Sequence, residues 1–584
     1  MNQDLKSSVS VQSSQYSQTW NLDQVLHNSG ASYDKIENYL NELTEKIEKI
    51  SINLNTIFKP FQELLDEVHE AGSLITCLSS MDTSDPRATK AEAKYNNVAA
   101  LLENLAKKIE EKLIDIDEKS FEKLLEANKD ISFAIIEMRD LAKEKMSLDK
   151  ELLALDLSIS GHSAFTTLYY TFIGSLSFQT KDKALNLSRL EKLFSNSDRE
   201  VRKDAFDTME TELTKHETIF GQILNNIVDF RLNLYKQRGW DSHLHETLKK
   251  NRLEEKSLKT MWKVVSENKA PLQKYLKHKA KLLGLEKLSW CDLDAPLGTK
   301  EEAKIPWELG CKNIIEQFGK VSPKLAKFSE DALKNGWVDA KAQDKKRAGG
   351  FCTGIPLRKE SRILMTYTDT FDSQSTLAHE LGHAFHSHVL YDKPTFMQNY
   401  PMNVAEAAST MCEMIVADSA LKSAKSKKEK LLLLDDKITS YLAFNMNLHS
   451  RFLFDDRLHE KRKAGFLTPE ELNDLMQSCQ KEAYADSLSS YLPHFWCYKM
   501  HFYFTDVPFY NWPYTFGYLF SLGTYNLLLN NDFENKYIAL LRDSGSMNVE
   551  ELAKKHLKTD LGEKEFWQGA MDILNNDINE FVSL

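Results

Sequence analysis

Five consecutive residues, His379-Glu380-Leu381-Gly382-His383, form the pattern H-E-x-x-H. Because an α-helix has about 3.6 residues per turn, residues four apart lie on one face, so His379 and His383 can present two imidazoles to a single metal ion. Paired imidazoles are common ligands of Zn²⁺, and a glutamate beside them can accept the proton of a bound water. The spacing therefore predicts one Zn²⁺ per chain, with His379 and His383 as ligands and Glu380 as general base.

A third ligand is expected downstream, because a catalytic zinc has three protein ligands and one open position. Residues 403–413 have the pattern of a second helix, and Glu406 lies near its start. Three small residues of this helix would let it pack closely on the zinc helix: Ala405, Ala407 and Ala408. We therefore predict Glu406 as the third metal ligand.

Several residues near these two helices have alternative interpretations. Asn403 and Glu406 have the spacing of a capping box, which would place Glu406 for local reasons alone. Glu413, seven residues after Glu406, is a rival ligand or an acceptor for a histidine N–H. His386 is near enough to be a ligand in principle, but a third imidazole would distort the helix, so we expect it to contact a ligand from outside or to pack instead. Cys412 is expected in the core, because a thiolate ligand would define a different site.

The segment before the zinc helix interrupts the helical patterns. Residues 348–356 contain glycine and proline and predict a loop, whereas residues 362–368 are the best strand candidate in the chain. A turn over 369–375 follows, with Asp372 or Ser373 as the expected N-cap of the zinc helix. An exposed strand edge at this place would allow an extended peptide to pair with it as one further strand.

The composition limits the classes of partner. The chain has 584 residues, 42% of them hydrophobic, enough for several cores or for one large helical body divided by a cleft. The formal charge of -11 and a pI near 5.9 leave no sustained basic field, so we expect neither a nucleic-acid nor a membrane partner. The seven cysteines include no C-x-x-C pair, and no apolar run approaches the ~18–20 residues of a membrane span. With a polar N-terminus as well, a cytoplasmic location is expected.

Helical periodicity dominates the first part of the chain. Apolar residues recur at steps of three and four over residues 36–50 and again over residues 98–113. The turn-forming stretch 82–86 separates them, so residues 1–114 are predicted to form an antiparallel hairpin of two long helices. A later long helix is expected to begin after an N-cap at 196–198 and to end at Gly239.

Three segments give the chain a resemblance to a known family. They are His379–His386, Glu406–Glu413, and His501-Phe-Tyr with the following Phe509–Phe520. Weaker similarities occur at residues 198–202, 238–240 and 294–296. Over about residues 115–580 the chain resembles the M3 family of zinc peptidases, the group of oligoendopeptidase F and thimet oligopeptidase, and it is most similar to the bacterial oligoendopeptidase F branch.

The resemblance implies a mainly α fold, a two-lobed helical metallopeptidase with a small β-sheet beside the zinc helix and a deep substrate channel. It implies a small helical domain over residues 115–190 and a zinc metallopeptidase catalytic domain over residues 191–584, after the helical region 1–114. It also implies cleavage of peptides about 5–20 residues long, which agrees with an extended chain that rises ~3.3 Å per residue through a closed channel.

The resemblance also nominates hydrogen-bond donors for the oxyanion that forms during peptide hydrolysis. They are His501, Tyr510 and Tyr514, which would also bind the substrate. Tyr518 continues the four-residue spacing, but it is equally well explained as a core residue, and Pro513 argues against a regular helix here. The tyrosine spacing differs from that of the thimet oligopeptidase branch, so the tyrosine that reaches the oxyanion stays open.

The predicted function is therefore that of a zinc-dependent endopeptidase that hydrolyses oligopeptides, with a monomer favoured. Two alternatives remain. A zinc carboxypeptidase with a similar helix would need a cation for the terminal carboxylate of its substrate, such as Arg347, Arg358 or Arg362. A non-catalytic helical binding protein would contain no zinc.

Overall fold

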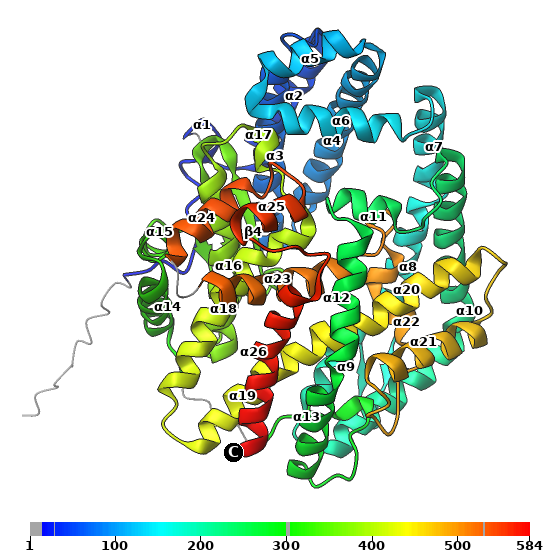
Figure 1. Cartoon of the computed structure of the whole chain (residues 1–584), viewed down its shortest axis with the longest axis vertical. Coiled ribbons are helices and arrows are strands. Elements are labelled where there is room, and N and C mark those ends of the chain that lie inside the picture. The colour runs from blue at the N-terminus through cyan, green and yellow to red at the C-terminus, as the bar shows by residue number, and fades with distance from the viewer. Residues whose placement is uncertain (1–14, 29, 299–303, 529–531) are drawn as a thin grey trace, which may run out of the picture. The chain divides into compact units, whose positions relative to one another are not determined.

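The computed structural model describes residues 15–28, 30–298, 304–528 and 532–584. In this part of the chain the structure is predominantly helical with two small sheets, as the sequence predicts (Figure 1). The chain divides into two compact units. Unit 1 comprises Met1–Ile50, Glu63–Leu102 and Glu302–Tyr391, and unit 2 comprises Ser51–Gln62, Glu103–Glu301 and Asp392–Leu584. The domain limits near residues 114 and 190 remain a prediction.

Unit 1 contains the helix of the H-E-x-x-H residues and a three-stranded sheet. Its helices are α1 (Val25–Asn28), α2 (Tyr33–Lys49), α3 (Phe58–Met81), α4 (Pro86–Asp115), α14 (Trp307–Val321), α15 (Pro323–Lys334), the short η4 (Pro356–Arg358) and α16 (Phe371–Leu390). The first residues of α3 and the last residues of α4 fall in the ranges of unit 2. The strands are β3 (Val338–Asp339), β4 (Phe351–Ile355) and β5 (Glu360–Leu364).

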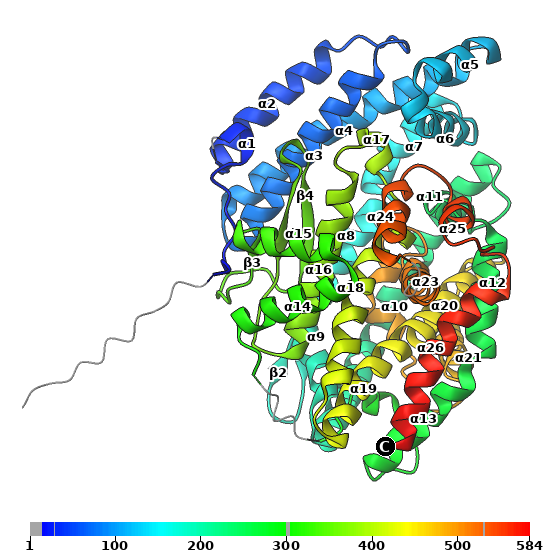
Figure 2. The same cartoon turned by 60° about the vertical axis from the view of Figure 1, so that its left-hand side comes forward.

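Helices α2, α3 and α4 pack side by side (Figure 2). Gly72 of α3 lies against Tyr95 of α4, where a Cβ would be only 2.7 Å from a ring atom. The structure thus has three helices where the apolar pattern predicts two. The stretch 50–57 divides the first of them, because Asn53 accepts hydrogen bonds from backbone N–H groups that follow it and so turns the chain.

The sheet of unit 1 has the order β3-β5-β4, with β3 parallel and β4 antiparallel to β5. Strand β5 covers only the first part of the predicted strand at 362–368, and β4 lies in the stretch 348–356, where a loop is predicted. The prediction of a free edge at 362–368 is wrong, because β5 is central and both of its sides are already paired. Helix α16 packs on β4 and β5.

Unit 2 consists of helices and one two-stranded sheet, formed by β1 (Phe178–Gln179) and β2 (Ala184–Leu185). Its longer helices are α5 (Glu118–Ala127), α6 (Ser132–Lys143), α7 (Leu148–Ser160), α8 (Ser163–Ser175), α10 (Arg199–Arg238), α12 (Glu255–Glu267), α13 (Lys269–Leu282), α18 (Met402–Ser423), α19 (Lys427–Leu442), α20 (Leu448–Arg462), α21 (Pro469–Ala483), α23 (Trp512–Leu528), α24 (Phe533–Asp543), α25 (Val549–His556) and α26 (Lys564–Ser583). Its shorter turns are η1 (Lys129–Ile131), α9 (Leu187–Glu191), η2 (Lys192–Ser195), α11 (His245–Lys250), η3 (Trp290–Asp292), α17 (Thr395–Gln398), η5 (Ala443–Asn447), α22 (Phe495–Tyr498) and η6 (Met500–Tyr503).

The long helix α10 begins and ends where the sequence predicts. The side chain of its N-cap, Asp198, accepts a hydrogen bond from the Glu200 N–H, and Gly239 ends the helix with a φ of 75°. Helix α18 packs on α23, α23 packs on α26, and α20 contacts both α10 and α23. These helices form the scaffold for the predicted site residues of unit 2.

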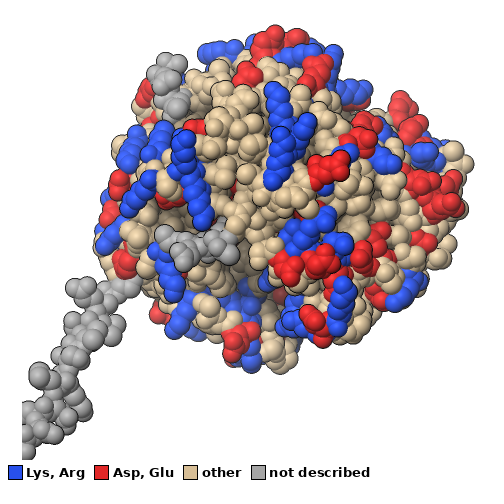
Figure 3. All heavy atoms as spheres, turned by 90° about the horizontal axis from the view of Figure 1, so that it is seen from below, with Lys and Arg blue, Asp and Glu red and all other residues tan. Residues whose placement is uncertain are grey.

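Within the residues that the structure describes, no helix is long and apolar enough to cross a membrane. On the face drawn in Figure 3, lysine and arginine side chains are interspersed with aspartate and glutamate, and neither sign covers the face alone. Such mixing produces no extended basic field on that face.

Candidate metal centre

Helix α16 carries the H-E-x-x-H residues of unit 1. Its N-cap is Thr370, whose hydroxyl accepts a hydrogen bond from the Ser373 N–H at 3.2 Å. The predicted N-caps, Asp372 and Ser373, are wrong by two or three residues, because both already lie in the first turn, where the charge of Asp372 is favourable. One face of the helix is buried and apolar, through Leu377, Ala378, Leu381, Ala384 and Phe385.

His379 and His383 lie one turn apart on α16, with their Nε2 atoms 3.1 Å from each other and their ring planes at 84°. A tetrahedral ion with Zn–N bonds of about 2.0–2.1 Å would hold two ligand nitrogens about 3.3 Å apart. Both side chains are partly exposed. The two rings are therefore arranged as ligands of one ion.

Glu380, the predicted base, is 5% exposed and lies against Gly350 in the segment before β4. A Cβ at position 350 would be 2.9 Å from Glu380 Oε1 and 3.4 Å from the side chain of Thr376. A side chain at this position would displace the carboxylate. Sequence reasoning does not identify Gly350; its only signal there is the pair Gly349-Gly350.

Helix α18 carries Glu406 in unit 2. The helix begins at Met402 after Pro401, and no side chain caps it. The predicted capping box of Asn403 and Glu406 is therefore wrong, because both residues already lie inside the helix. Ser409 donates a hydrogen bond from Oγ to Glu406 Oε2 at 2.8 Å, and this contact orients the carboxylate from the next turn.

Helix α23 approaches α18 closely at Gly517. A Cβ at position 517 would lie 3.0 Å from both the carbonyl oxygen of Asn403 and the Cβ of Glu406. One turn later, Ser521 donates a hydrogen bond to the carbonyl oxygen of Ala407 at 3.2 Å. A glycine on α23 thus lets the two helices approach closely and fixes the backbone of Glu406 against α23. The predicted packing of the α18 alanines on the zinc helix stays a prediction.

His379, His383 and Glu406 form a group that could hold a metal ion, with one donor atom from each within 4.8 Å of the others. Among the described residues this is the one such group, and Glu413 does not belong to it. Two imidazole nitrogens and a carboxylate oxygen are the donors of many catalytic zinc sites with an open fourth position. They suit Ca²⁺ and Mg²⁺ less well, since these ions prefer oxygen ligands alone.

The predicted oxyanion donors of unit 2 lie next to one another. His501, on η6, stacks on Tyr510 with 5.1 Å between ring centroids and 14° between ring planes. The hydroxyl oxygens of Tyr510 and Tyr514 are 2.7 Å apart. Burial raises the pKa of Tyr514, and the hydrogen bond with Tyr510 raises it further, so the Tyr514 phenol remains protonated at neutral pH. All three side chains are partly exposed.

Helix α23 begins at Trp512, so Pro513 lies in the first turn, where its missing N–H is tolerated. The expectation that Pro513 prevents a regular helix is therefore wrong. Tyr514 and Tyr518 share this helix but not their surroundings. Tyr518 is 5% exposed and stacks on Phe444 at 4.2 Å, which makes it a core residue.

Arg451, on α20, contacts this cluster and is absent from the sequence predictions. Its Nη1 lies 3.0 Å from His501 Nδ1 and 3.2 Å from Asn511 Oδ1. Burial is the main cause that lowers the pKa of His501, and together with the positive charges of Arg451 and Lys499 it brings the pKa to about 3. His501 is therefore neutral at physiological pH.

The remaining candidates on α16 and α18 are buried. His386 is fully buried and does not belong to the donor group, as its predicted packing role requires. Cys412 is 1% exposed, and burial raises the pKa of its thiol, which confirms the prediction of a core residue.

Residues 192–573 match the family model of peptidase family M3. The chain belongs to peptidase family M3. This match contains the H-E-x-x-H residues, Glu406 and the cluster of His501, and it confirms the resemblance that these segments predict.

Two curated relatives of this M3 chain are oligopeptidases. The chain is 26% identical over 400 residues to the "Oligoendopeptidase F homolog" of Lactococcus lactis subsp. lactis (strain IL1403), a match that covers 67% of this chain and 65% of that protein, just under two thirds of its length. It is 22% identical over 591 residues to "Oligopeptidase PepF" of Bacillus subtilis (strain 168), covering 97% of this chain and 87% of that protein.

Solved structures show the same fold as this M3 chain. A putative peptidase from Chlamydophila abortus aligns with a TM-score of 0.83 at 19% identity, over 97% of this chain and 98% of that one. The oligoendopeptidase-F from Enterococcus faecium aligns with a TM-score of 0.68 at 17% identity, over 94% and 97% of the two chains. The likeness confirms the predicted helical fold.

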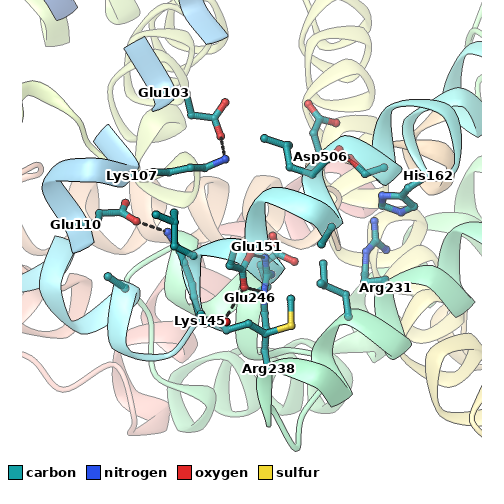
Figure 4. Close-up of a pocket in the computed structure, with 18 of the residues that line it drawn as sticks. Glu103, Lys107, Glu110, Lys145, Glu151, His162, Arg231, Arg238, Glu246 and Asp506 are labelled. Atoms are coloured by element: carbon teal, nitrogen blue, oxygen red, sulfur yellow. Dashed lines mark hydrogen bonds and ion pairs between the residues drawn. The ribbon is translucent and has the colours of Figure 1, made fainter. Parts of the chain in front are cut away.

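One cavity of unit 2, of about 630 Å³, contains none of the predicted site residues of this M3 chain (Figure 4). Two ion pairs lie in its wall, Lys107 with Glu103 and Lys145 with Glu110. His162 lies beside Arg231 in the close-up view. The lysines of these two pairs are therefore already compensated by carboxylates.

Proposed function

We propose that this member of family M3 is a zinc metalloendopeptidase that hydrolyses internal bonds of short, unstructured peptides. The observation that carries the proposal is the pair of Nε2 atoms of His379 and His383, 3.1 Å apart, with Glu380 between them in sequence. Glu406 is proposed as the third ligand, which the donor group within 4.8 Å supports. The oligopeptidase names of the relatives support the substrate class.

A Zn²⁺ ion bound by these residues would lower the pKa of a water molecule to about 7 and polarise the carbonyl of the peptide. Glu380 accepts the proton of the attacking water and then passes it to the nitrogen of the leaving amine. The burial of Glu380 against Gly350 restricts the position of its carboxylate, so the base is already oriented for the proton transfer. Ser409 holds the carboxylate of Glu406 through its hydrogen bond.

The cluster of unit 2 supplies hydrogen-bond donors in this proposal. His501 and Tyr514 donate to the carbonyl oxygen as it becomes negative, and Tyr510 orients the Tyr514 phenol through their shared hydrogen bond. Tyr518 has no part in the reaction, because it is buried against Phe444.

Replacement of Glu380 by glutamine tests the role of the base. We expect kcat for an internally cleaved peptide to fall about 10²–10⁴-fold while bound zinc, measured by elemental analysis, is retained. His383→Ala serves as the contrasting variant, since it should lose zinc together with activity. Peptide cleavage that resists a chelator, or faster cleavage of an intact folded protein than of peptides, would refute the proposal.

The ligand assignment is tested by a matched pair of variants on α18. Glu406→Gln should lower the zinc content, whereas Glu413→Gln should leave it unchanged, because Glu413 does not belong to the donor group. The reverse result would make Glu413 the ligand.

The carboxypeptidase alternative depends on a cation for the terminal carboxylate of the substrate. Arg358 and Arg362 both form ion pairs with Glu360, at 3.2 and 3.0 Å, and Arg347 lies over the ring of Phe351. Two of the three predicted cations thus already share one carboxylate, which competes with the terminal carboxylate of a substrate and favours internal cleavage. Mass spectrometry of the products separates the two activities, and zinc analysis separates both from a non-catalytic binding protein. The cytoplasmic location and the monomeric state remain predictions.

A further inference from the structure

Arg451 is a partly exposed arginine whose described partners are all neutral. Its Nε donates a hydrogen bond to Asn447 Oδ1 at 2.8 Å, its Nη1 donates to Asn511 Oδ1 at 3.2 Å, and its guanidinium lies 5.1 Å from the centre of the Phe495 ring. No carboxylate of the described residues lies within ion-pair distance of it. Burial lowers the pKa of Arg451 to about 10, so the side chain is still a cation at neutral pH.

The contact between Arg451 and His501 determines the tautomer of the histidine. Arg451 Nη1 lies 3.0 Å from His501 Nδ1, and a guanidinium has only donors to offer. Nδ1 must therefore accept, and the proton of the neutral imidazole then resides on Nε2. Tyr510 stacks on the ring and Phe504 meets it at 70°, so the imidazole is held in one orientation.

The charged groups that face His501 are all positive, so they disfavour protonation of its imidazole. Besides burial, they are Arg451 from α20 and Lys499 from the segment before η6. Lys499 is itself paired with Glu191 at 2.6 Å. Tyr510 contributes an aromatic face on the remaining side, and no described carboxylate accepts a hydrogen bond from the ring.

We propose that Arg451 is a positioning residue that holds His501 as the neutral tautomer with its proton on Nε2, ready to donate to the substrate. The inference rests on the proposed function of His501 as an oxyanion donor. Where a carboxylate accepts from Nδ1–H of a catalytic histidine, Nε2 is left as a base. Arg451 has the opposite effect. Because Nδ1 accepts a hydrogen bond from the guanidinium, Nε2 carries the proton and acts as a donor that cannot take up another proton. Proton transfer is thereby left to Glu380 alone.

The tautomer can be measured in the substrate-free protein. Histidine labelled with ¹⁵N gives separate Nδ1 and Nε2 signals for each tautomer, and the signals of His501 are identified by their loss in His501→Gln. Arg451→Met removes the donor, Arg451→Lys keeps one, and Arg457→Met is the matched control. Arg457 lies on the same helix, is partly exposed and pairs with Glu482 at 2.7 Å.

We expect wild-type His501 to show an unprotonated Nδ1 and a protonated Nε2 across about pH 5–8. In Arg451→Met the proton should distribute over both nitrogens, and the pKa of the imidazole should rise toward its ordinary value of about 6.5. Arg451→Lys should keep most of the wild-type signal, and Arg457→Met all of it. A wild-type protein with the proton on Nδ1, or a folded Arg451→Met protein with unchanged His501 signals, would overturn the proposal.

Kinetics separate the positioning role from a role in substrate binding. In Arg451→Met, kcat should fall roughly 10–100-fold, as for other partners that orient a histidine, with a smaller change in KM and partial recovery in Arg451→Lys. The fall in kcat should be the same for peptides with a free C-terminal carboxylate and for peptides with an amidated C-terminus. A loss confined to free-acid peptides would overturn the proposal, because Arg451 would then bind the terminal carboxylate.

Different results refute the donor role of His501 and the positioning role of Arg451. Full activity of His501→Leu, which removes every side-chain donor at this position, would refute the donor role of His501, and the positioning role with it. Loss of activity in His501→Leu, without any change of tautomer in Arg451→Met, would refute the positioning role alone and leave the proposed function intact.

Discussion

Two arginines of unit 2, the buried Arg202 and the partly exposed Arg451, have opposite electrostatic surroundings. Arg202 is 2% exposed and forms an ion pair with Asp292, a fully buried carboxylate that also binds Arg199. Arg451 has amide oxygens and the imidazole of His501 as its partners. A buried cation matched by a carboxylate is neutralised and acts on stability, whereas a cation held by neutral groups keeps a charge that can orient its neighbours.

This difference explains part of the resemblance to family M3. The weak similarity at residues 198–202 contains Arg202 and the N-cap Asp198, and both have structural partners: Asp292 for the arginine and a backbone N–H for the cap. Similarity to a peptidase family therefore does not by itself show that a residue takes part in catalysis. The surroundings of the charge separate the two kinds of arginine.

The largest expected effect concerns Asp292. Asp292→Asn should lower the free energy of unfolding by about 3–5 kcal/mol, because it leaves Arg202 buried without a counter-charge. Urea unfolding measures this loss, while kcat of the folded fraction should stay within about 2-fold of wild type. Arg199→Met is the control: the Arg199 side chain is 37% exposed, so its loss should cost only about 1 kcal/mol. If kcat of Asp292→Asn fell as much as kcat of Arg451→Met, the distinction between Arg202 and Arg451 would be refuted.

Tyr514 belongs to the cluster of Arg451, so its replacement should change rate rather than stability. Tyr514→Phe should lower kcat about 10²–10³-fold, the usual cost of one oxyanion donor. Tyr518→Phe, on the same helix, should leave kcat within about 3-fold of wild type. Steady-state kinetics on one peptide measures both. Equal losses in the two variants would show that the helix, and not the phenol of Tyr514, is the sensitive feature.

The carboxylate of Asp292 should also give stability a dependence on pH. Burial raises its pKa, but hydrogen bonds from Arg199, Ser289 and Arg202 outweigh burial and lower the pKa to about 2. Because the pKa in the unfolded chain is about 3.9, the stabilisation is complete above that value and is lost as pH falls toward about 2. The difference in urea midpoint between wild type and Asp292→Asn should therefore shrink on acidification from pH 5. A constant difference would contradict the assignment.

The smallest effect is expected for Arg358, which already has a carboxylate partner in Glu360. Arg358→Met should change the ratio of cleavage rates for free-acid and amidated peptides by less than about 2-fold. Paired assays on one peptide in its two forms measure this ratio. A selective loss for the free acid would revive the carboxypeptidase alternative and show that an ion-paired arginine can still serve the substrate.

The two histidines of the candidate metal site could be predicted from the sequence because their geometry is local. Residues four apart lie on one face of any α-helix, so formation of α16 is enough to bring the Nε2 atoms of His379 and His383 close together. The core role of Cys412 and the ends of α10 were predictable for the same reason, since each depends on neighbouring residues.

The features that sequence reasoning missed depend on contacts between distant segments. Gly350 matters because the segment before β4 runs against Glu380, and Arg451 matters because α20 and η6 bring it to His501. Spacing along the chain contains neither contact. The predicted strand at 362–368 was found in part, but its place in the sheet was not, because the order of strands depends on β3 and on the glycine-containing β4.

The hydrogen atom in place of a side chain at Gly517 has a consequence for motion. Helices α18 and α23 touch there so closely that neither can slide past the other without a clash between Gly517 and Glu406. The carboxylate on one helix and the Tyr514 phenol on the other therefore travel together. When the protein adjusts to admit a peptide, we expect α18 and α23 to move as one rigid pair, with a constant distance between Glu406 and Gly517.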